Sequence, residues 1–344
     1  MRDFWNLIIR NLKNKRGDTL YVHYPCFDGL ISGVLAWEFL ETQQHWTIRD
    51  VRPINYNVRD QWLSMSLGPR TAVVDFLYHP KAAFWVDHHL TSFVSGDAKS
   101  DFEHRKGFLP LLYDSHSGSS ALLLWNRFAR AMNYPDRYRE MVDWAEKIDS
   151  AAYSSVYEAV LGDAPALRIN FSLMSRDAHT KAFCDYLMRQ LRNRSLAEVA
   201  ELPDIKTKYE RVRELVERGL DHLRGRLTLL SNIVAFDVEA SDDAMISRYA
   251  PYYFVPNADY SIGITRYPHG AKITSMRNPW RNFESIPLGT IFARYGGGGH
   301  QRVASVFLSE DRANNVEAIA DDILRDIRAY QAELSVAAPE AALA

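Results

Sequence analysis

Two short apolar runs near the start of the chain each end on a carboxylate. The runs cover residues 72–74 and 83–86, and two histidines stand directly after the acidic residue of the second run. Runs this short and this continuously apolar are typical of strands buried on both faces of a parallel sheet. We therefore predict two parallel strands whose carboxyl ends carry these polar side chains: Asp75, Asp87, His88 and His89.

An earlier segment predicts a third strand of the same sheet. Residues 19–23 read Thr-Leu-Tyr-Val-His, and a glycine-containing turn then leads into a helical pattern over 30–42. A strand, a turn and a helix in this order open a βαβ unit. His23 closes the strand, and Asp28 lies near the helix N-terminus, where the helix dipole favours its charge. By itself Asp28 is an ordinary helix cap, but beside two other strand ends it belongs to the crevice where open α/β sheets bind ligands.

Two further segments of the N-terminal half predict helices. Residues 4–12 have apolar residues at near-helical spacing and a basic end. We favour a helix packed on the sheet edge over an interfacial membrane helix, because the segment is short and its polar face thinly charged. Residues 114–125 predict a polar loop that runs into an apolar helix capped by Ser119 or Ser120. Capping explains this loop more simply than contact with a substrate phosphate.

The middle of the chain is helical in pattern. The pattern extends from residue 127 to residue 229, with a polar break at 193–195. Apolar residues recur at helical spacing over 205–229, which predicts a long helix connecting two domains.

A second domain is predicted from about Ser231. The pattern changes there to short strand-like segments separated by turn residues, and a last helix is expected over 314–331. The strand-like segments are 232–236, 252–255, 260–265, 272–276 and 303–307. They predict an α+β domain with a mostly antiparallel or mixed sheet.

The predicted fold class is therefore α/β. A parallel-sheet domain with helices on both faces is followed by a helical connector and a smaller α+β domain. The alanine-rich end of the chain has little to bury, so we predict a disordered tail. The expected boundaries are 1–195, 196–230, 231–332 and 333–344.

Composition limits the partners and the compartment. The chain of 344 residues carries 41 Lys and Arg against 43 Asp and Glu, so a polyanionic partner has to be held by a local cluster or by metal ions. Only two cysteines are present, which suits a reducing compartment. Neither a signal peptide nor a membrane span is evident, and we expect a soluble cytoplasmic protein.

The ordered polar motifs resemble those of the DHH phosphoesterase superfamily, which is named for the triplet that stands here at 87–89. The family's strand-terminal histidine motif is matched by His23 in HYPCFDG, and its strand-terminal Asp by Asp75 in VVDF. A further Asp in the helical part is matched by Asp149 in WAEKIDSAAY, with Asp143 as the less favoured candidate.

A glycine-rich motif near the C-terminus extends the resemblance. Residues 296–305, GGGGHQRVAS, resemble the corresponding motif of the DHH-associated C-terminal domain. The resemblance spans residues 19–308 with all motifs in the same order. It implies a phosphoesterase similar to the nano-RNases, oligoribonucleases and dinucleotide phosphodiesterases of this superfamily.

The expected cofactor is a pair of divalent ions. Carboxylates and imidazoles favour Mn²⁺, with Mg²⁺, Zn²⁺ or Fe²⁺ as alternatives. Two such ions would clamp a phosphoryl group and activate a water molecule. The resemblance implies that Asp75 bridges the two ions. It also implies that His23 binds the first ion and that the second is bound by Asp28, His88 and Asp149. Asp87 would then orient a histidine, and His89 would face the substrate phosphate.

Cys26 departs from the family pattern. It stands two residues before Asp28, where most members have an Asp. A thiolate there could bind the first metal and bias it toward zinc or iron, the first metal could be weak or absent, or Cys26 could simply pack. The sequence leaves these three interpretations open.

The substrate-binding residues are expected in the second domain. Consecutive glycines allow a backbone to approach a ligand closely and to present N–H groups to an anion, and arginine suits bidentate contact with phosphate. The predicted residues are Arg277, Gly296, Gly297, Gly298, Gly299 and His300. Within the resemblance they imply a nucleotide or the end of an oligonucleotide as ligand, clasped between the domains.

The expected function is hydrolysis of phosphoester bonds in short oligonucleotides, dinucleotides or nucleotide bisphosphates by two-metal activation of water. The alternative is a nucleotide-binding protein of the same fold in which Cys26 has weakened catalysis. Acidic groups that crowd together without a metal repel one another, so their retention favours the enzyme. A homodimer is compatible with the sequence, and no membrane partner is expected.

Overall fold

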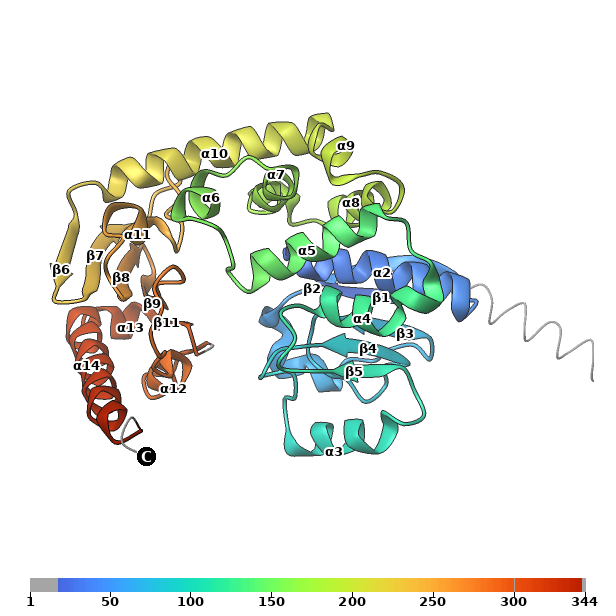
Figure 1. The fold of residues 1–344 in the computed structure, drawn as a ribbon, viewed down its shortest axis with the longest axis horizontal. Helices are drawn as coiled ribbons and strands as arrows, with labels where there is room; N and C mark the ends of the chain where they lie inside the picture. Colours follow the sequence, from blue (N-terminus) through green and yellow to red (C-terminus); the bar gives the residue numbers. More distant parts are fainter. Residues whose placement is uncertain (1–17, 300, 342–344) are drawn as a thin grey trace, which may run out of the picture. The chain divides into compact units, whose positions relative to one another are not determined.

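The structure is a computed structural model that describes residues 18–299 and 301–341 (Figure 1). The helix expected over 4–12 and the predicted substrate-binding residue His300 lie outside the described residues.

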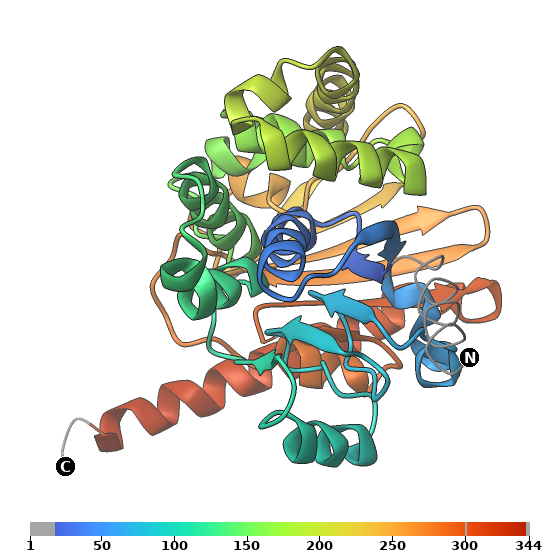
Figure 2. The same cartoon turned by 90° about the vertical axis from the view of Figure 1, so that its right-hand side faces the viewer.

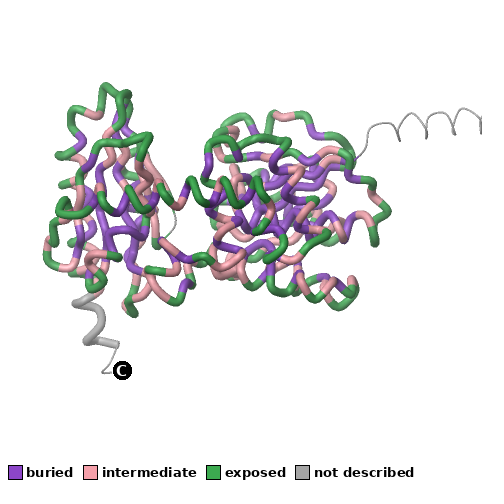
Figure 3. Tube along the Cα trace, turned by 90° about the horizontal axis from the view of Figure 1, so that it is seen from above, coloured by how far each residue is buried: buried purple, intermediate pink, exposed green. Residues whose placement is uncertain are grey.

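The chain divides into two units. The first comprises Met1–Ala152 and Asp163–Arg211, and the second comprises Tyr153–Gly162 and Val212–Ala344. Figure 3 shows buried segments, in purple, running through the middle of each unit. Each unit therefore has its own core.

Five strands form the parallel sheet of the first unit, in the order β2-β1-β3-β4-β5. They are β1 (Asp18–His23), β2 (Ile48–Ile54), β3 (Thr71–Val74), β4 (Phe84–Asp87) and β5 (Leu111–Tyr113). The strand order reverses where β1 lies beside β3, and such switch points are where open parallel sheets bind ligands. The predicted α/β class and the three predicted strands are confirmed, whereas β2 and β5 were not predicted.

One face of this sheet is covered by helices (Figure 1). They are α2 (Phe27–Gln43), α4 (Ser120–Met132), α5 (Arg137–Asp149), α7 (Pro165–Ser172), α8 (Lys181–Asn193) and α9 (Leu196–Ala200). Helix α2 begins three residues before the predicted position. It can start so close to β1 because a Cβ on Gly29 would lie only 2.0 Å from the carbonyl oxygen of His23, a space that only glycine leaves open.

The opposite face of the sheet is covered by a 3-10 helix, η1 (Tyr56–Ser64), and by α3 (Gly96–Arg105). Trp62 from η1 is fully buried there and donates its indole N–H to the carbonyl of Leu77 at 3.0 Å. Helices on both faces are thus confirmed, although neither η1 nor α3 was predicted.

The predicted connector helix is present but shorter than expected. Helix α10 covers Pro203–Leu223, and Leu227–Leu230 forms strand β6 instead of continuing the helix. Gly225 stands between them with φ +76°, a left-handed conformation that ends helices. Helix α6 (Val156–Leu161) belongs to the second unit.

The second unit contains a mixed sheet in the order β10-β11-β9-β8-β7-β6, as predicted. Its other strands are β7 (Ile233–Glu239), β8 (Tyr260–Tyr267), β9 (Gly270–Arg277), β10 (Gly298–Gly299) and β11 (Val303–Ser309). Strands β7 and β8 pair in parallel, and the remaining pairs are antiparallel. Helix α14 (Val316–Ala341), red in Figure 2, and the short helices α12 (Leu288–Ala293) and α13 (Glu310–Ala313) complete the unit.

One prediction for this unit is wrong. The expected strand 252–255 is part of helix α11 (Ala250–Phe254), because Pro251 in the first turn suits a helix start and outweighs the strand preference of the aromatic residues. Helix α14 runs to Ala341. The disordered tail expected over 333–344 stays a prediction.

None of the helices in the described residues combines the length and the apolar composition that crossing a bilayer requires.

Candidate metal centre

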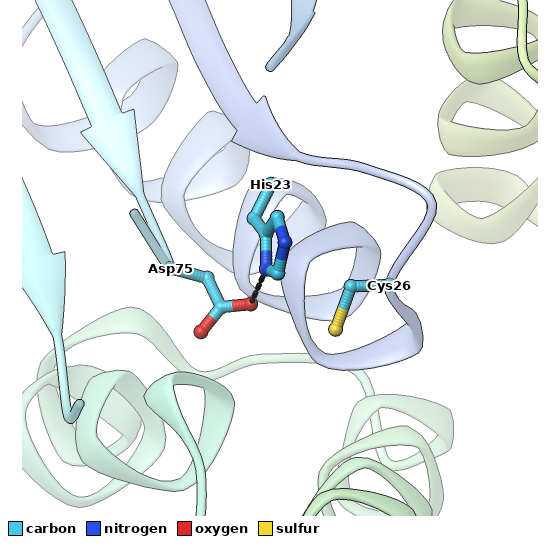
Figure 4. A group of neighbouring side chains, drawn as sticks. All are labelled: His23, Cys26 and Asp75. Carbon is cyan, nitrogen blue, oxygen red and sulfur yellow. Dashed lines mark hydrogen bonds and ion pairs between the residues drawn. The ribbon is translucent and has the colours of Figure 1, made fainter. Parts of the chain in front are cut away.

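The carboxyl ends of three neighbouring strands bring predicted site residues together. His23 ends β1, Asp75 directly follows β3, and residues 87–89 follow from the end of β4. The His23 Nδ1 atom lies 3.1 Å from Asp75 Oδ2 (Figure 4). The switch point between β1 and β3 is therefore also the position of the acidic and imidazole residues.

Asp75 is held in an unusual backbone conformation. Its φ of +57° is left-handed, which Asp and Asn adopt more readily than most residues. Its N–H donates to the carbonyl of Val86 at 2.8 Å, and the hydroxyl of Ser120 donates to its Oδ1 at 2.9 Å. The carboxylate is fully buried, so both its position and its direction are fixed.

Asp28 is anchored by the start of helix α4. Its carboxylate accepts the backbone N–H groups of Ser120 at 2.8 Å and Ala121 at 2.9 Å. These N–H groups have no partner inside their own helix, and the helix dipole favours a negative charge there. Ser119 caps the same helix, as one of the two predicted choices.

His88 presents its Nε2 atom to three carboxylates. Nε2 lies 3.2 Å from Asp149 Oδ2 and 3.8 Å from both Asp28 Oδ2 and Asp75 Oδ1. Its Nδ1 lies 3.0 Å from the carbonyl oxygen of Ser117, which can only accept, so Nδ1 carries the proton. Nε2 is buried and has no hydrogen-bond partner of acceptable geometry among the described residues. In the neutral ring, a nitrogen lone pair thus faces three carboxylates.

Asp87 holds the neighbouring histidine. Its Oδ1 accepts from His89 Nδ1 at 2.7 Å, and its Oδ2 accepts from the Ser92 hydroxyl at 2.6 Å. Both oxygens are occupied and the residue is fully buried. Asp87 therefore fixes the ring of His89, and the role of this pair in catalysis stays a prediction.

Each carboxylate in this cluster makes ionisation of its neighbours less favourable. Burial and the charges of Asp28 and Asp149 raise the pKa of Asp75 well above its usual range. Burial and the charge of Asp149 also raise the pKa of Asp28. Without a cation, repulsion between the carboxylates therefore favours protonation of the cluster.

The pKa values of the three histidines are shifted in different directions: those of His88 and His89 are raised, and that of His23 is lowered. Burial opposes the charged form of His88, but the interaction with Asp149 and the charge of Asp28 raise its pKa to about 9. Burial and the charge of His89 lower the pKa of His23 to about 4. Burial would likewise lower the pKa of His89, yet the hydrogen bond and charge of Asp87 raise it.

These residues fit a divalent cation. Three groups of side chains each place one donor atom per residue within 4.8 Å of the others. The groups are His23, Cys26 and Asp75; Asp75, His88 and His89; and Asp28, His88 and Asp149. Asp75 belongs to two of them, and a cation facing His88 Nε2 would replace the proton that this atom otherwise has to hold.

The geometry separates the two candidates in helix α5. Asp149, the last residue of the helix, reaches His88, whereas Asp143 forms an ion pair with Arg139 on the surface. The Asp143 side chain is 51% exposed against 25% for Asp149. Asp149 is therefore the residue that joins the cluster.

Cys26 also lies at the centre, as the residue that precedes helix α2. Burial and the negative charges of Asp75, Asp149 and Asp28 raise the pKa of its thiol well above the usual range, and the N–H of Gly29 offsets part of this effect.

Some residues that line or support the centre were not predicted as part of it. The ring of Tyr56 lies edge-on to His23 at 5.2 Å between centroids and to His89 at 6.4 Å. Ser92 and Ser120 hold Asp87 and Asp75 through their hydroxyls. Their only sequence signal was the apolar helix after Ser120, which suggested a cap and not a contact with Asp75.

The predicted substrate-binding residues lie in the second unit. Arg277 is buried, and its guanidinium donates to the carbonyls of Asn278 at 3.0 Å and of Arg281 at 2.9 Å. Gly298 and Gly299 form strand β10, which pairs with β11. A direct contact of Arg277 or of these glycines with substrate stays a prediction.

A cavity of about 410 Å³ also lies in the second unit, between the sheet and helix α14. Leu230, Ile262 and Ile264 are among its apolar lining residues, and Asp237 and Glu317 are among its charged ones. The carboxylates of Asp237 and Glu317 both pair with Arg266.

No protein-family model matches the sequence, and no curated protein matches it. Solved structures, in contrast, share its fold. A pGpG-specific phosphodiesterase from Vibrio cholerae, PggH, superimposes with a TM-score of 0.68 at 19% sequence identity, over 90% of this chain and 99% of its own. The exonuclease RecJ bound to manganese gives a TM-score of 0.50 at 12% identity, over 90% and 92% of the two chains.

The class defined by the sheet and the site is a two-unit α/β protein with an acidic and imidazole cluster at the switch point of a parallel sheet. Within that class, the chain has the fold of the DHH-domain proteins.

Proposed function

We propose that this protein is a metal-dependent phosphoesterase that hydrolyses short oligonucleotides or dinucleotides. The observation that carries the proposal is His88 Nε2, a buried nitrogen that faces three carboxylates at 3.2–3.8 Å, the nearest of which belongs to Asp149. A divalent cation is the group that satisfies the lone pair and the carboxylates together.

Two sets of residues would hold the ions. His23 and Asp75 form one set, and Asp28, His88 and Asp149 form the other, with Asp75 close enough to contribute to both. Divalent ions bound there would supply activation of the attacking water and neutralisation of charge on the phosphoryl group. Manganese suits the carboxylate and imidazole donors of the second set.

The remaining residues act on the ligands and on the substrate. Asp87 fixes the ring of His89 through Nδ1, and we assign His89 the contact with the phosphoryl group that is cleaved. Ser120 keeps Asp75 directed into the centre, and Asp28 is kept in place by the first N–H groups of α4. Fixed positions of this kind reduce the reorganisation needed during the reaction.

The proposed substrate is a 5′-phosphorylated diribonucleotide. The fold matches that of a pGpG-specific phosphodiesterase over nearly the whole of both chains, which supports a substrate of that size. Arg277, Gly296–Gly299 and His300 are proposed to hold the part of the substrate that is not cleaved. Cyclic dinucleotides and nucleotide bisphosphates are the comparison substrates.

The test is hydrolysis of pGpG in Mn²⁺ by the wild type, by Asp75→Asn and by Asp143→Asn, with the products separated by chromatography. Asparagine is chosen because residue 75 has a left-handed backbone conformation that alanine adopts poorly. We expect mononucleotides from the wild type and from Asp143→Asn, and a rate lower by about 10³-fold or more for Asp75→Asn.

Failure of the wild type to cleave pGpG, with Mn²⁺, Mg²⁺, Zn²⁺ or Fe²⁺, would exclude this substrate. If cyclic dinucleotides and nucleotide bisphosphates also remain intact, the protein is a nucleotide-binding protein and not a hydrolase.

A further inference from the structure

The side chain of Cys26 stands at the start of a helix and at the edge of the metal centre. Cys26 is the N-cap residue of helix α2, where Ser, Thr, Asp or Asn would normally hydrogen bond to the first turn. In the described part of the chain the Cys26 sulfur makes no capping hydrogen bond of full geometry, and the N–H of Gly29 in the first turn is the backbone group that favours its thiolate form. In Figure 4 the sulfur lies near the imidazole of His23 and the carboxylate of Asp75.

The other cysteine, Cys184, is an example of a cysteine that packs in the core. Cys184 in helix α8 is fully buried in the apolar core of the first unit, beside residues such as Leu187 and Met188. Cys26 is only partly buried, and its sulfur lies within 4.8 Å of donor atoms of His23 and Asp75. Its surroundings are those of a ligand, not those of a core residue.

The donor atoms also fit in number, charge and spacing. A thiolate, a neutral imidazole and a carboxylate together carry two negative charges, which balance a divalent cation. Zinc takes sulfur at about 2.3 Å and nitrogen or oxygen at about 2.0–2.2 Å in a tetrahedral arrangement, so its ligand atoms lie about 3.3–3.6 Å apart. That spacing lies within the 4.8 Å limit of the observed group.

We infer that Cys26 is a thiolate ligand of the ion held by His23 and Asp75, and that this position prefers Zn²⁺, Fe²⁺ or Co²⁺ over Mn²⁺ or Mg²⁺. Thiolates select the softer divalent ions, whereas the set of Asp28, His88 and Asp149 offers only oxygen and nitrogen donors. The two halves of the centre therefore differ in metal preference. On binding, the thiol proton leaves to solvent as the sulfur–metal bond forms. This inference rests on the proposed function, since it concerns the same centre.

The first test is Co²⁺ titration of the metal-free full-length protein, because a cobalt–thiolate bond gives a charge-transfer absorption band in the near ultraviolet. We expect the band in the wild type and in Cys184→Ala, the matched control that removes the only other cysteine. Cys26→Ser should lack the band while it still binds Co²⁺ at the other set of ligands. Circular dichroism melting of each variant verifies that it is folded.

The cobalt–thiolate absorption band tests whether Cys26 is a ligand, and this test does not depend on enzymatic activity. Bound Co²⁺ without a thiolate band in the wild type, or a band that persists in Cys26→Ser, overturns the role of Cys26. If such a protein still hydrolyses pGpG with Mn²⁺, the proposed function stands without the inference. A wild type that binds no Co²⁺ and hydrolyses nothing overturns both.

Cys26→Asp tests the metal preference directly. The substitution replaces the sulfur by a carboxylate oxygen, so the ratio of Zn²⁺ affinity to Mn²⁺ affinity, measured by competition with a chelating dye, should fall by about tenfold or more. An unchanged ratio contradicts the inference that the sulfur selects the ion.

Discussion

The two units of this protein use their polar side chains in different ways. In the first unit, the donor atoms of His23, Asp75 and His88 face one another, and other residues hold them there. In the second unit, Arg277 directs its guanidinium at backbone carbonyls of residues 278–283. In the first unit, hydrogen bonds from other residues leave these donor atoms able to bind a ligand. In the second unit, the guanidinium of Arg277 is occupied by hydrogen bonds to its own loop.

The glycines of the second unit show the same difference. A Cβ on Gly297 would lie 2.4 Å from the carbonyl oxygen of Ser305 in strand β11. This glycine is therefore required by close packing against β11, whatever its contact with a ligand. A polar or flexible motif is evidence for a site when its groups lack partners inside the protein, and weaker evidence when packing already explains them.

Asp75→Asn should have the largest effect. Besides the loss of activity given above, we expect it to abolish most of the rise in melting temperature that Mn²⁺ or Zn²⁺ gives the wild type. In excess chelator, Asp75→Asn should instead be more stable than the wild type, because it removes a carboxylate whose ionisation its buried neighbours oppose.

The stability difference between Asp75→Asn and the wild type in chelator should depend on pH, because the pKa of Asp75 is shifted. The pKa of Asp75 is raised in the folded protein, so the stability penalty of the wild type is absent below the unfolded pKa of about 3.9 and grows as the pH rises above it. Denaturant unfolding in chelator at pH 4 and pH 8 checks this. A wild type that is as stable as Asp75→Asn at pH 8 would show that the carboxylates do not repel one another.

Asp149→Asn should have the next largest effect. Asp149 lies 3.2 Å from His88 Nε2, and we expect its loss to lower activity by about 10²-fold and to weaken metal binding. Asp143→Asn is the control from the same helix, because its side chain pairs only with Arg139 at the surface in the described structure. Equal losses in both variants, measured as kcat/KM for pGpG, would contradict the assignment of Asp149.

The sequence predicted the centre of the first unit because its signals are local. Apolar runs that end on Asp75 and Asp87 identify strand ends, and parallel strands bring such ends together. Strand β2 escaped prediction because it is an edge strand with Arg49 and Arg52 exposed, so that it lacks a continuous apolar run. The supporting contacts of Ser120 could not be predicted, because its hydroxyl meets Asp75 across 45 residues of sequence.

The aromatic segment of the second unit was misread for a related reason. Local preference for strands in residues 252–255 competes with the helix start at Pro251, and the sequence pattern alone does not decide between them. Arg277 was predicted to contact phosphate because its residue type suits that role, and this contact stays a prediction. Its bonds to residues 278–283 depend on how that loop folds back, which no periodicity reports.

Gly297→Ala tests the packing explanation. The new methyl group would collide with the Ser305 carbonyl, so β10 or β11 has to shift, and we expect the second unit to be destabilised by about 2–3 kcal/mol. Faster hydrogen exchange of the amides in β9 and β11 would report this shift. Co²⁺ binding at the first unit should be unchanged. A variant with unaltered exchange but a higher KM for pGpG would instead assign Gly297 to substrate binding.

Arg277→Lys should give the smallest effect and decides the role of this residue. A lysine has one ammonium group in place of the planar fork that bonds to Asn278, Arg281 and Phe283, so it keeps the charge but loses part of this set. We expect a loss of about 1–2 kcal/mol in the stability of the second unit, measured by hydrogen exchange of β9, together with a modest rise in KM for pGpG, because the proposed function also gives this side chain a contact with the substrate. A loss of stability with KM unchanged would show that Arg277 serves only its own loop. A higher KM would mean that the guanidinium also reaches the substrate, and that the second unit, like the first, keeps a charged group available for it.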